Sequence, residues 1–192
     1  NKQGSAYTQA NTLVKNGCEI IISFGFAGAL DPQLSAGDLI IPKSVTDAEG
    51  NIYRTDYNLH QKLSSHFSNK FKVTVGELFG ATTIIWGADE KKRLFNRYNT
   101  KIVDMESLGV AQAAAENGCS FLIVRAISDT ANQSLPKESL RSINLNNDIK
   151  IINILIDLAK NLNELPSLLR LAQNSRKAHI CLRNVAKLGF GI

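Results

Sequence analysis

Two short acidic clusters are the residues in this chain whose types and spacing could carry chemistry. Each follows an apolar segment with the composition of a β-strand, and a small-residue helix expected over 107–116 separates them. In an α/β sheet, ligands gather at the carboxyl ends of strands. One helical crossover would therefore bring both clusters to one crevice. The clusters are Asp104, Met105 and Glu106, and Ser128 with Asp129.

Each of these residues also has a purely structural interpretation. An aspartate after a strand, such as Asp129, is more often a turn former or a helix cap than a catalyst. Glu106 could cap the following helix, Met105 could fill the core, and Asp104 could be a supporting or capping acid. Arg125 stands four residues before Asp129, so we expect it on the same side of the strand, where it would orient that carboxylate.

Length and composition limit the classes of protein. The chain has 192 residues, of which 44% are hydrophobic and 20% charged, and this composition predicts a single globular domain. We expect this domain to consist of a core over 1–163 and a basic helical extension over 164–192. The longest apolar runs are strand-sized, too short to span a bilayer. Three cysteines without CxxC spacing indicate reduced thiols in a cytoplasmic protein and no metal site. Basic residues are not interleaved with aromatic ones, which disfavours nucleic-acid binding.

Helix and strand patterns alternate along the chain and favour an α/β layered fold. A turn over 25–32 follows the first strand, and its glycines would let Gly25 and Phe26 approach a ligand. The expected helices are 4–15, 59–67, one from residue 89, 149–162 and 167–188; the expected strands are 18–24, 39–41, 71–75, 78–85 and 120–127; a polar surface loop is expected over 44–58.

The last helical segment, 165–188, leaves two alternatives open. Its apolar residues can share a face while basic residues such as Arg176 and Arg183 lie elsewhere. This pattern predicts either peripheral contact with an anionic membrane surface or docking of the apolar face on the domain or on another subunit. The residues that would form this face are Leu168, Ala172, Leu182 and Val185.

Three ordered motifs carry a family resemblance: ISFGFAGALDPQLSAGDLIIP over 22–42, VDMES over 103–107 and RAISDTAN over 125–132. Together they resemble the purine nucleoside phosphorylase and nucleosidase family, with its phosphorylase/hydrolase-like fold. The resemblance implies three α/β/α layers around a central mixed sheet. DEKKRLFNRYNTKIVDMES over 89–107, with Leu135-Pro136 and the basic tail, looks most like the hopanoid-associated nucleoside phosphorylases.

The resemblance also implies roles for individual residues. Met105 and Glu106 would hold the ribose, and Asp129, with Ser128 beside it, would be the general acid for the leaving purine. Thr83 and Ile84 would lie along the base. These residue types fit cleavage of an N-glycosidic bond, which needs a proton donor for the base and an acceptor for the sugar hydroxyls.

The chain departs from the family pattern in two places. Ser23 and Phe26 stand where phosphate-using members carry Arg and Ser, so the site would bind an anion less well. This favours hydrolysis, or phosphorolysis with phosphate held elsewhere. The chain also begins near the end of the family's first Gly-rich loop. We therefore expect a sheet that lacks the first strands, with an exposed edge that favours pairing into a homo-oligomer.

The predicted function is cleavage of the N-glycosidic bond of a purine nucleoside with release of the base. The substrate that the subfamily resemblance implies is an adenosyl-hopanoid precursor. The alternatives are a methylthioadenosine or adenosylhomocysteine type nucleosidase and a non-catalytic ligand-binding member of the fold. We expect no organic cofactor, with phosphate as the one candidate co-substrate.

Overall fold

The computed structural model describes residues 2–135 and 165–191, and the helix expected over 149–162 lies outside them. Helices and strands alternate through the described residues, as the sequence patterns predict. In chain order they are α1 Lys2–Lys15, β1 Ile20–Ala29, β2 Leu39–Thr46, β3 Ile52–Arg54, α2 Tyr57–Ser68, β4 Val73–Gly80, α3 Ala88–Tyr98, β5 Ile102–Asp104, α4 Ser107–Asn117, β6 Ser120–Asp129 and α7 Leu165–Leu188.

The strands form one mixed sheet in the order β3-β2-β4-β5-β1-β6, and β2 also pairs with β6, so that the sheet closes on itself. β1 runs parallel to β6, and β4 runs parallel to both β2 and β5. β1 is antiparallel to β5, and β2 is antiparallel to β3 and β6. The mixed α/β fold with a central sheet is therefore confirmed.

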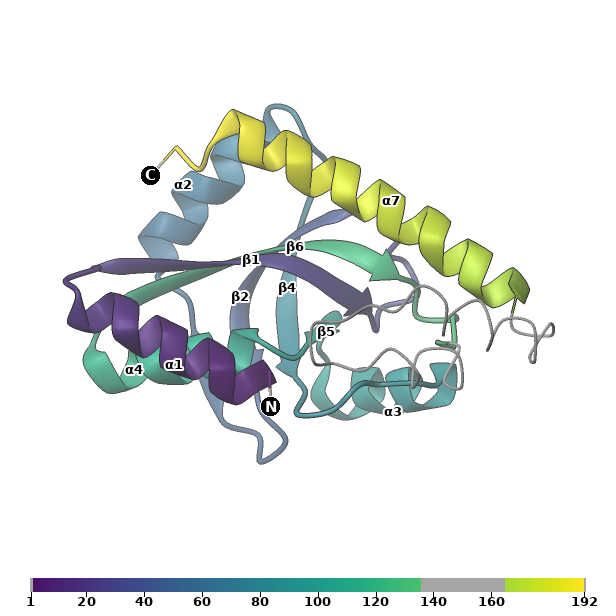
Figure 1. The fold of residues 1–192 in the computed structure, drawn as a ribbon, viewed down its shortest axis with the longest axis horizontal. Coiled ribbons are helices and arrows are strands. Elements are labelled where there is room, and N and C mark those ends of the chain that lie inside the picture. The colour runs from purple at the N-terminus through teal and green to yellow at the C-terminus, as the bar shows by residue number, and fades with distance from the viewer. Residues whose placement is uncertain (1, 136–164, 192) are drawn as a thin grey trace, which may run out of the picture.

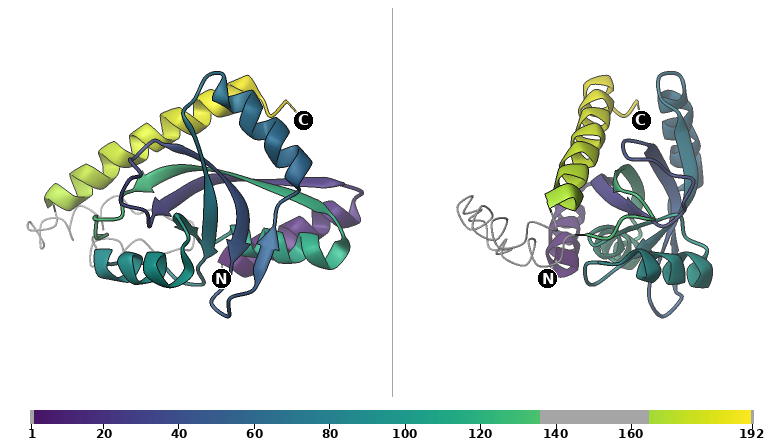
Figure 2. Two further views of the ribbon diagram at one scale, coloured as in Figure 1. Left: turned by 180° about the vertical axis from the view of Figure 1, so that it is seen from behind. Right: turned by 90° about the vertical axis from the view of Figure 1, so that its right-hand side faces the viewer.

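Helices cover the sheet on two sides (Figure 1; Figure 2). α7 and α2 lie on one side, over an apolar cluster that includes Leu63, Phe67 and Leu122. α1, α4 and α3 lie on the other side, and α1 runs beside α4. Gly109 permits this close approach, because a Cβ there would lie 2.9 Å from the backbone nitrogen of Tyr7.

Three sequence-based boundaries are wrong. β1 continues to Ala29, so Gly25 and Phe26 belong to a strand and not to a turn, because β1 keeps pairing with β6 beyond them. β2 continues past Pro42, because the pairing with β4 shifts register there and so tolerates the missing backbone N–H of the proline. The surface loop expected over 44–58 contains β3. β4 is one strand that ends at Gly80, which leaves the following segment, 81–87, as a loop.

The two edges of β1 differ in their pairing. Along one edge, Ile20 to Gly28 pair with β6. Along the other, among the described strands, β5 pairs with β1 at Gly28 and Ala29 alone. Phe24 and Phe26, on the less paired part of the strand, are 39% and 45% exposed.

Helix α7 packs against the sheet through the second half of its length. Leu182 and Val185, two of the four residues expected to form its apolar face, are buried, whereas Ala172 is exposed. Cys181 lies in the same buried cluster, and burial raises the pKa of its thiol. Docking on the domain therefore occupies residues that a membrane contact would need.

In the described part of the chain, every helix is too short or too polar to cross a membrane.

Candidate active site

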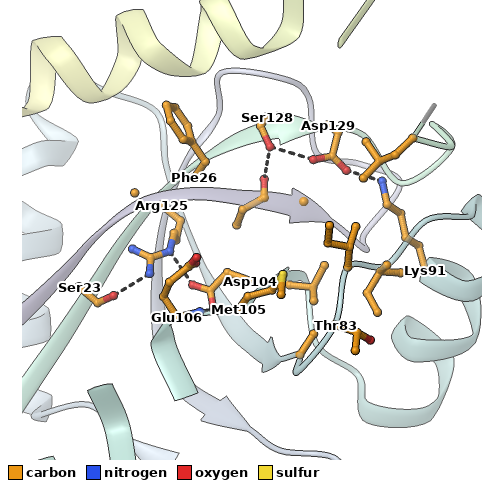
Figure 3. Close-up of a pocket in the computed structure, with 18 of the residues that line it drawn as sticks. Ser23, Phe26, Thr83, Lys91, Asp104, Met105, Glu106, Arg125, Ser128 and Asp129 are labelled. Atoms are coloured by element: carbon orange, nitrogen blue, oxygen red, sulfur yellow. Dashed lines mark hydrogen bonds and ion pairs between the residues drawn. The ribbon is translucent and has the colours of Figure 1, made fainter. Parts of the chain in front are cut away.

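A cavity of about 610 Å³ opens where the carboxyl-terminal parts of β1, β5 and β6 meet (Figure 3). Its size is typical of small-molecule sites. All ten residues selected from the sequence line it, although they come from four separate segments of the chain. They are Gly25, Phe26, Thr83, Ile84, Asp104, Met105, Glu106, Arg125, Ser128 and Asp129.

The floor of the cavity is a buried ion pair between Arg125 and Asp104. Arg125 Nε donates to Asp104 Oδ2 at 2.6 Å, and both side chains are 2% exposed. Arg125 Nη2 donates to the hydroxyls of Ser23 at 2.6 Å and Ser107 at 2.8 Å, and Nη1 donates to the carbonyl oxygen of Val124 at 3.1 Å. The guanidinium thus joins β1, β5, β6 and the start of α4.

Asp104 also anchors the segment that carries Met105 and Glu106. Its Oδ1 accepts hydrogen bonds from the backbone nitrogens of Ser107 at 3.0 Å and Glu106 at 3.3 Å, and its Oδ2 accepts from the Ser107 hydroxyl at 2.5 Å. Asp104 is therefore the supporting acid of this end of α4. Glu106 occupies the N-cap position of α4 without a side-chain capping hydrogen bond, and it lines the cavity.

The expectation that Arg125 orients Asp129 is wrong. The guanidinium of Arg125 is paired with Asp104. The cation paired with Asp129 is Lys91 from helix α3. Residues four apart on a strand share a face, but their partners depend on which neighbouring element reaches each end of the strand. Here β5 reaches Arg125, and α3 reaches Asp129.

Lys91 is the functional candidate that inspection of the sequence missed. Its Nζ lies 2.5 Å from Asp129 Oδ2, and its side chain is fully buried. A signal was present, because Lys91 falls at helical spacing with Leu94, Phe95 and Tyr98, which form the apolar face of α3. A lysine in an apolar stripe needs a buried partner.

Ser128 and Gly28 complete the surroundings of the Asp129 carboxylate. Ser128 Oγ donates to Asp129 Oδ1 at 2.8 Å. Gly28 lies opposite Asp129 in the pairing of β1 with β6. A Cβ at Gly28 would approach Asp129 Oδ2 to 2.9 Å, so the absence of a side chain lets the carboxylate lie against the strand.

The remaining expected residues line the rim and the far wall. Thr83 and Ile84 belong to the loop between β4 and α3, and Leu135 lies close to the same loop through a hydrogen bond from its nitrogen to the carbonyl oxygen of Trp86. The ring of Phe26 points away from the Arg125–Asp104 pair (Figure 3). Throughout the described residues, no group of three or more His, Cys, Asp or Glu could hold a metal ion.

Known proteins with similar sequences are nucleosidases. The 5'-methylthioadenosine/S-adenosylhomocysteine nucleosidase of Buchnera aphidicola is 29% identical over 178 residues, with 82% of this chain and 71% of the relative covered. The nucleosidase of the same name from Staphylococcus aureus is 26% identical over 132 residues. That match covers 59% of this chain and 58% of the relative.

Solved structures share the fold at lower sequence identity. The nucleosidase of the same name from Campylobacter jejuni superimposes with a TM-score of 0.63 at 18% identity, covering 86% of this chain and 74% of that one. Futalosine hydrolase of Helicobacter pylori gives 0.62 at 15%, covering 93% and 74%. The model of the phosphorylase superfamily matches residues 2–160, which is most of the chain. The chain therefore belongs to the phosphorylase superfamily.

Proposed function

We propose that this protein hydrolyses the N-glycosidic bond of a purine nucleoside with a small 5′-thio substituent and releases the base. The observation that carries the proposal is the joint placement of Asp129 and the Met105-Glu106 pair in one cavity. Cleavage of such a bond passes through a sugar cation, so an acceptor for the sugar hydroxyls and a donor for the base must lie on two sides of it.

We assign each residue a task from its place in the cavity. The carboxylate of Glu106 accepts hydrogen bonds from the sugar hydroxyls, and Met105 provides an apolar surface beside the ring. Asp129 lies at the other end of the cavity from Glu106 (Figure 3). In this proposal it faces the departing base. Thr83 and Ile84, on the loop before α3, form the wall along which the planar base lies.

Water is the nucleophile that the electrostatics favour. Among the described residues lining the cavity, the cations are Lys91 and Arg125. Both are engaged with carboxylates, and Arg125 also donates to Ser23, which stands where phosphate-using relatives carry an arginine. A phosphate ion needs a cationic partner with free donors. The cavity therefore favours hydrolysis over phosphorolysis.

The relatives from Buchnera aphidicola and Staphylococcus aureus are nucleosidases of methylthioadenosine and adenosylhomocysteine. They support a nucleoside-cleaving enzyme, and they also support the choice of substrate. The adenosyl-hopanoid substrate rests on the resemblance of the sequence motifs alone. We therefore rank the 5′-thio nucleosides first and retain the adenosyl-hopane as a competitor in the assay.

The test is adenine release from methylthioadenosine, adenosylhomocysteine, adenosine and an adenosyl-hopane, with and without phosphate. We expect release from the 5′-thio substrates without phosphate, and a loss of about 100-fold or more in Asp129→Asn, since general acid catalysis contributes that much. Asp89→Asn, which changes an exposed aspartate of α3, is the matched control and should keep full activity. A folded wild-type chain that releases no base would contradict the proposal and favour a non-catalytic binding protein.

A further inference from the structure

Lys91 is a fully buried lysine whose three donors all have partners. Its Nζ donates to Asp129 Oδ2 at 2.5 Å, to the carbonyl oxygen of Thr130 at 2.9 Å and to the carbonyl oxygen of Gln133 at 3.0 Å. An ammonium group has three N–H bonds, so this arrangement saturates it. The side chain is 0% exposed, whereas that of Asp129 is 10% exposed.

The acceptors of Lys91 belong to a short piece of chain that curls back over α3 after β6. The nitrogen of Ala88 at the start of α3 donates to Ser134 Oγ at 3.3 Å. The side chain of Gln133 accepts a hydrogen bond from Asn174 of α7 at 2.9 Å. Helices α3 and α7 therefore hold in place the segment that supplies two of the three acceptors of the ammonium group.

The pairing has a consequence for the reaction. Both oxygens of the Asp129 carboxylate face a donor, Oδ2 the ammonium group of Lys91 and Oδ1 the hydroxyl of Ser128, so a proton that Asp129 gives to a ligand can be replaced from one of these two groups. A leaving purine needs a proton, because the anion of the base is a poor leaving group. The nearest proton held by an acidic group is on Lys91.

We propose that Lys91 is a positioning residue that supplies the proton of the leaving purine through Asp129. This inference rests on the proposed function. As the bond between the sugar carbon and the base nitrogen breaks, its electron pair stays on the purine. Asp129 passes one proton to the purine and takes one from Lys91, which becomes a neutral amine. The water that adds to the sugar cation releases its proton to solvent, and Lys91 regains a proton from solvent through Asp129 once the base has left.

The chemistry of lysine suits this task. A buried lysine can lose and regain a proton, whereas an arginine keeps its proton in proteins. Both residues can hold a carboxylate in place by charge. Replacement by arginine therefore separates the supply of a proton from the supply of a positive charge.

The experiment compares two substrates with the same 5′-thio sugar, one with adenine and one with 4-nitrophenol as the leaving group. Nitrophenolate leaves without a proton, so only the adenine substrate needs the relay. In Lys91→Met and Lys91→Arg we expect kcat for the adenine substrate to fall by about 100-fold or more. KM for that substrate and kcat for the nitrophenyl substrate should stay close to the wild-type values. Lys92→Met, which changes the exposed neighbour in the same helix, is the matched control.

Several outcomes would overturn the proposal. A Lys91→Arg enzyme with wild-type kcat on adenine would show that charge alone suffices. Equal losses on both substrates, in a variant that melts cooperatively, would assign Lys91 a structural role. Failure of the proposed function is distinguishable, because the wild-type protein would then release neither leaving group.

Discussion

The cavity is lined by two carboxylate–cation pairs that are chemically similar but have different roles. In the Arg125–Asp104 pair both side chains are 2% exposed, and the remaining hydrogen bonds go to serines and backbone. In the Lys91–Asp129 pair the lysine is fully buried, and the aspartate side chain is 10% exposed. The first pair joins strands and a helix, and the second holds one carboxylate against the space where a ligand would lie.

The choice of cation matches this division. The planar guanidinium of Arg125 distributes several donors in fixed directions, which suits a junction of four elements. The ammonium group of Lys91 is a compact charge that can give up a proton. A buried ion pair therefore has a structural or a chemical use according to how far its carboxylate is exposed, which is 2% for Asp104 and 10% for Asp129.

The largest effect on stability is expected for Arg125→Met. Removal of the guanidinium leaves Asp104 as a buried charge without its cation, which costs about 3–5 kcal/mol in the free energy of unfolding. Denaturant unfolding measures the change. The double variant Asp104→Asn/Arg125→Met removes the stranded charge and should recover part of the loss. If Arg125→Met unfolds at the same denaturant concentration as the wild type, this pair does not hold the fold together.

A smaller loss of stability is expected for Ser107→Ala. The hydroxyl donates to Asp104 and accepts from Arg125, so its removal leaves buried polar atoms without a partner, at a cost of about 1–3 kcal/mol. Ser65→Ala, which changes an exposed serine of α2, should alter the unfolding free energy by less than about 0.5 kcal/mol. Equal effects of the two changes in denaturant unfolding would argue against the network.

Gly28→Ala should disturb the other pair. The new Cβ displaces the Asp129 carboxylate, and since a misplacement of about 1 Å can cost 100-fold in rate, we expect kcat to fall by about 10- to 100-fold. The melting temperature should change little, because the displaced atoms are the end of a side chain. Gly4→Ala, where a Cβ meets nothing within 4 Å, is the control for kcat. Normal turnover in Gly28→Ala would show that this contact is unimportant.

Ser128→Ala should have the smallest effect. It removes one hydrogen bond to Asp129 and leaves the Lys91 contact in place. A single hydrogen bond contributes about 0.5–1.5 kcal/mol, which corresponds to a loss of about 2- to 10-fold in kcat. Steady-state assays would detect it, with an unchanged melting temperature. A loss as large as that of Asp129→Asn would mean that Ser128, not Lys91, is the main partner of the carboxylate.

The sequence was sufficient to predict the alternation of helices and strands and ten of the residues that line the cavity, but not Lys91. Met105 and Glu106 follow β5 directly, and Ser128 and Asp129 end β6, so local sequence placed them at the edge of the sheet where strands terminate. Strand ends were predicted less well. Pro42 and the glycines of β1 are turn signals, but pairing with neighbouring strands overrode them.

What the sequence by itself determined is the set of chemical groups that border the cavity at the strand ends, because each follows a recognisable strand signal; Lys91, on helix α3, is not among them. The tertiary structure alone decided the partners of those groups. Arg125 and Asp129 are four residues apart, yet one is paired with Asp104, 21 residues away, and the other with Lys91, 38 residues away. Such distant partners depend on how the closed sheet and α3 pack, and no local pattern records that packing.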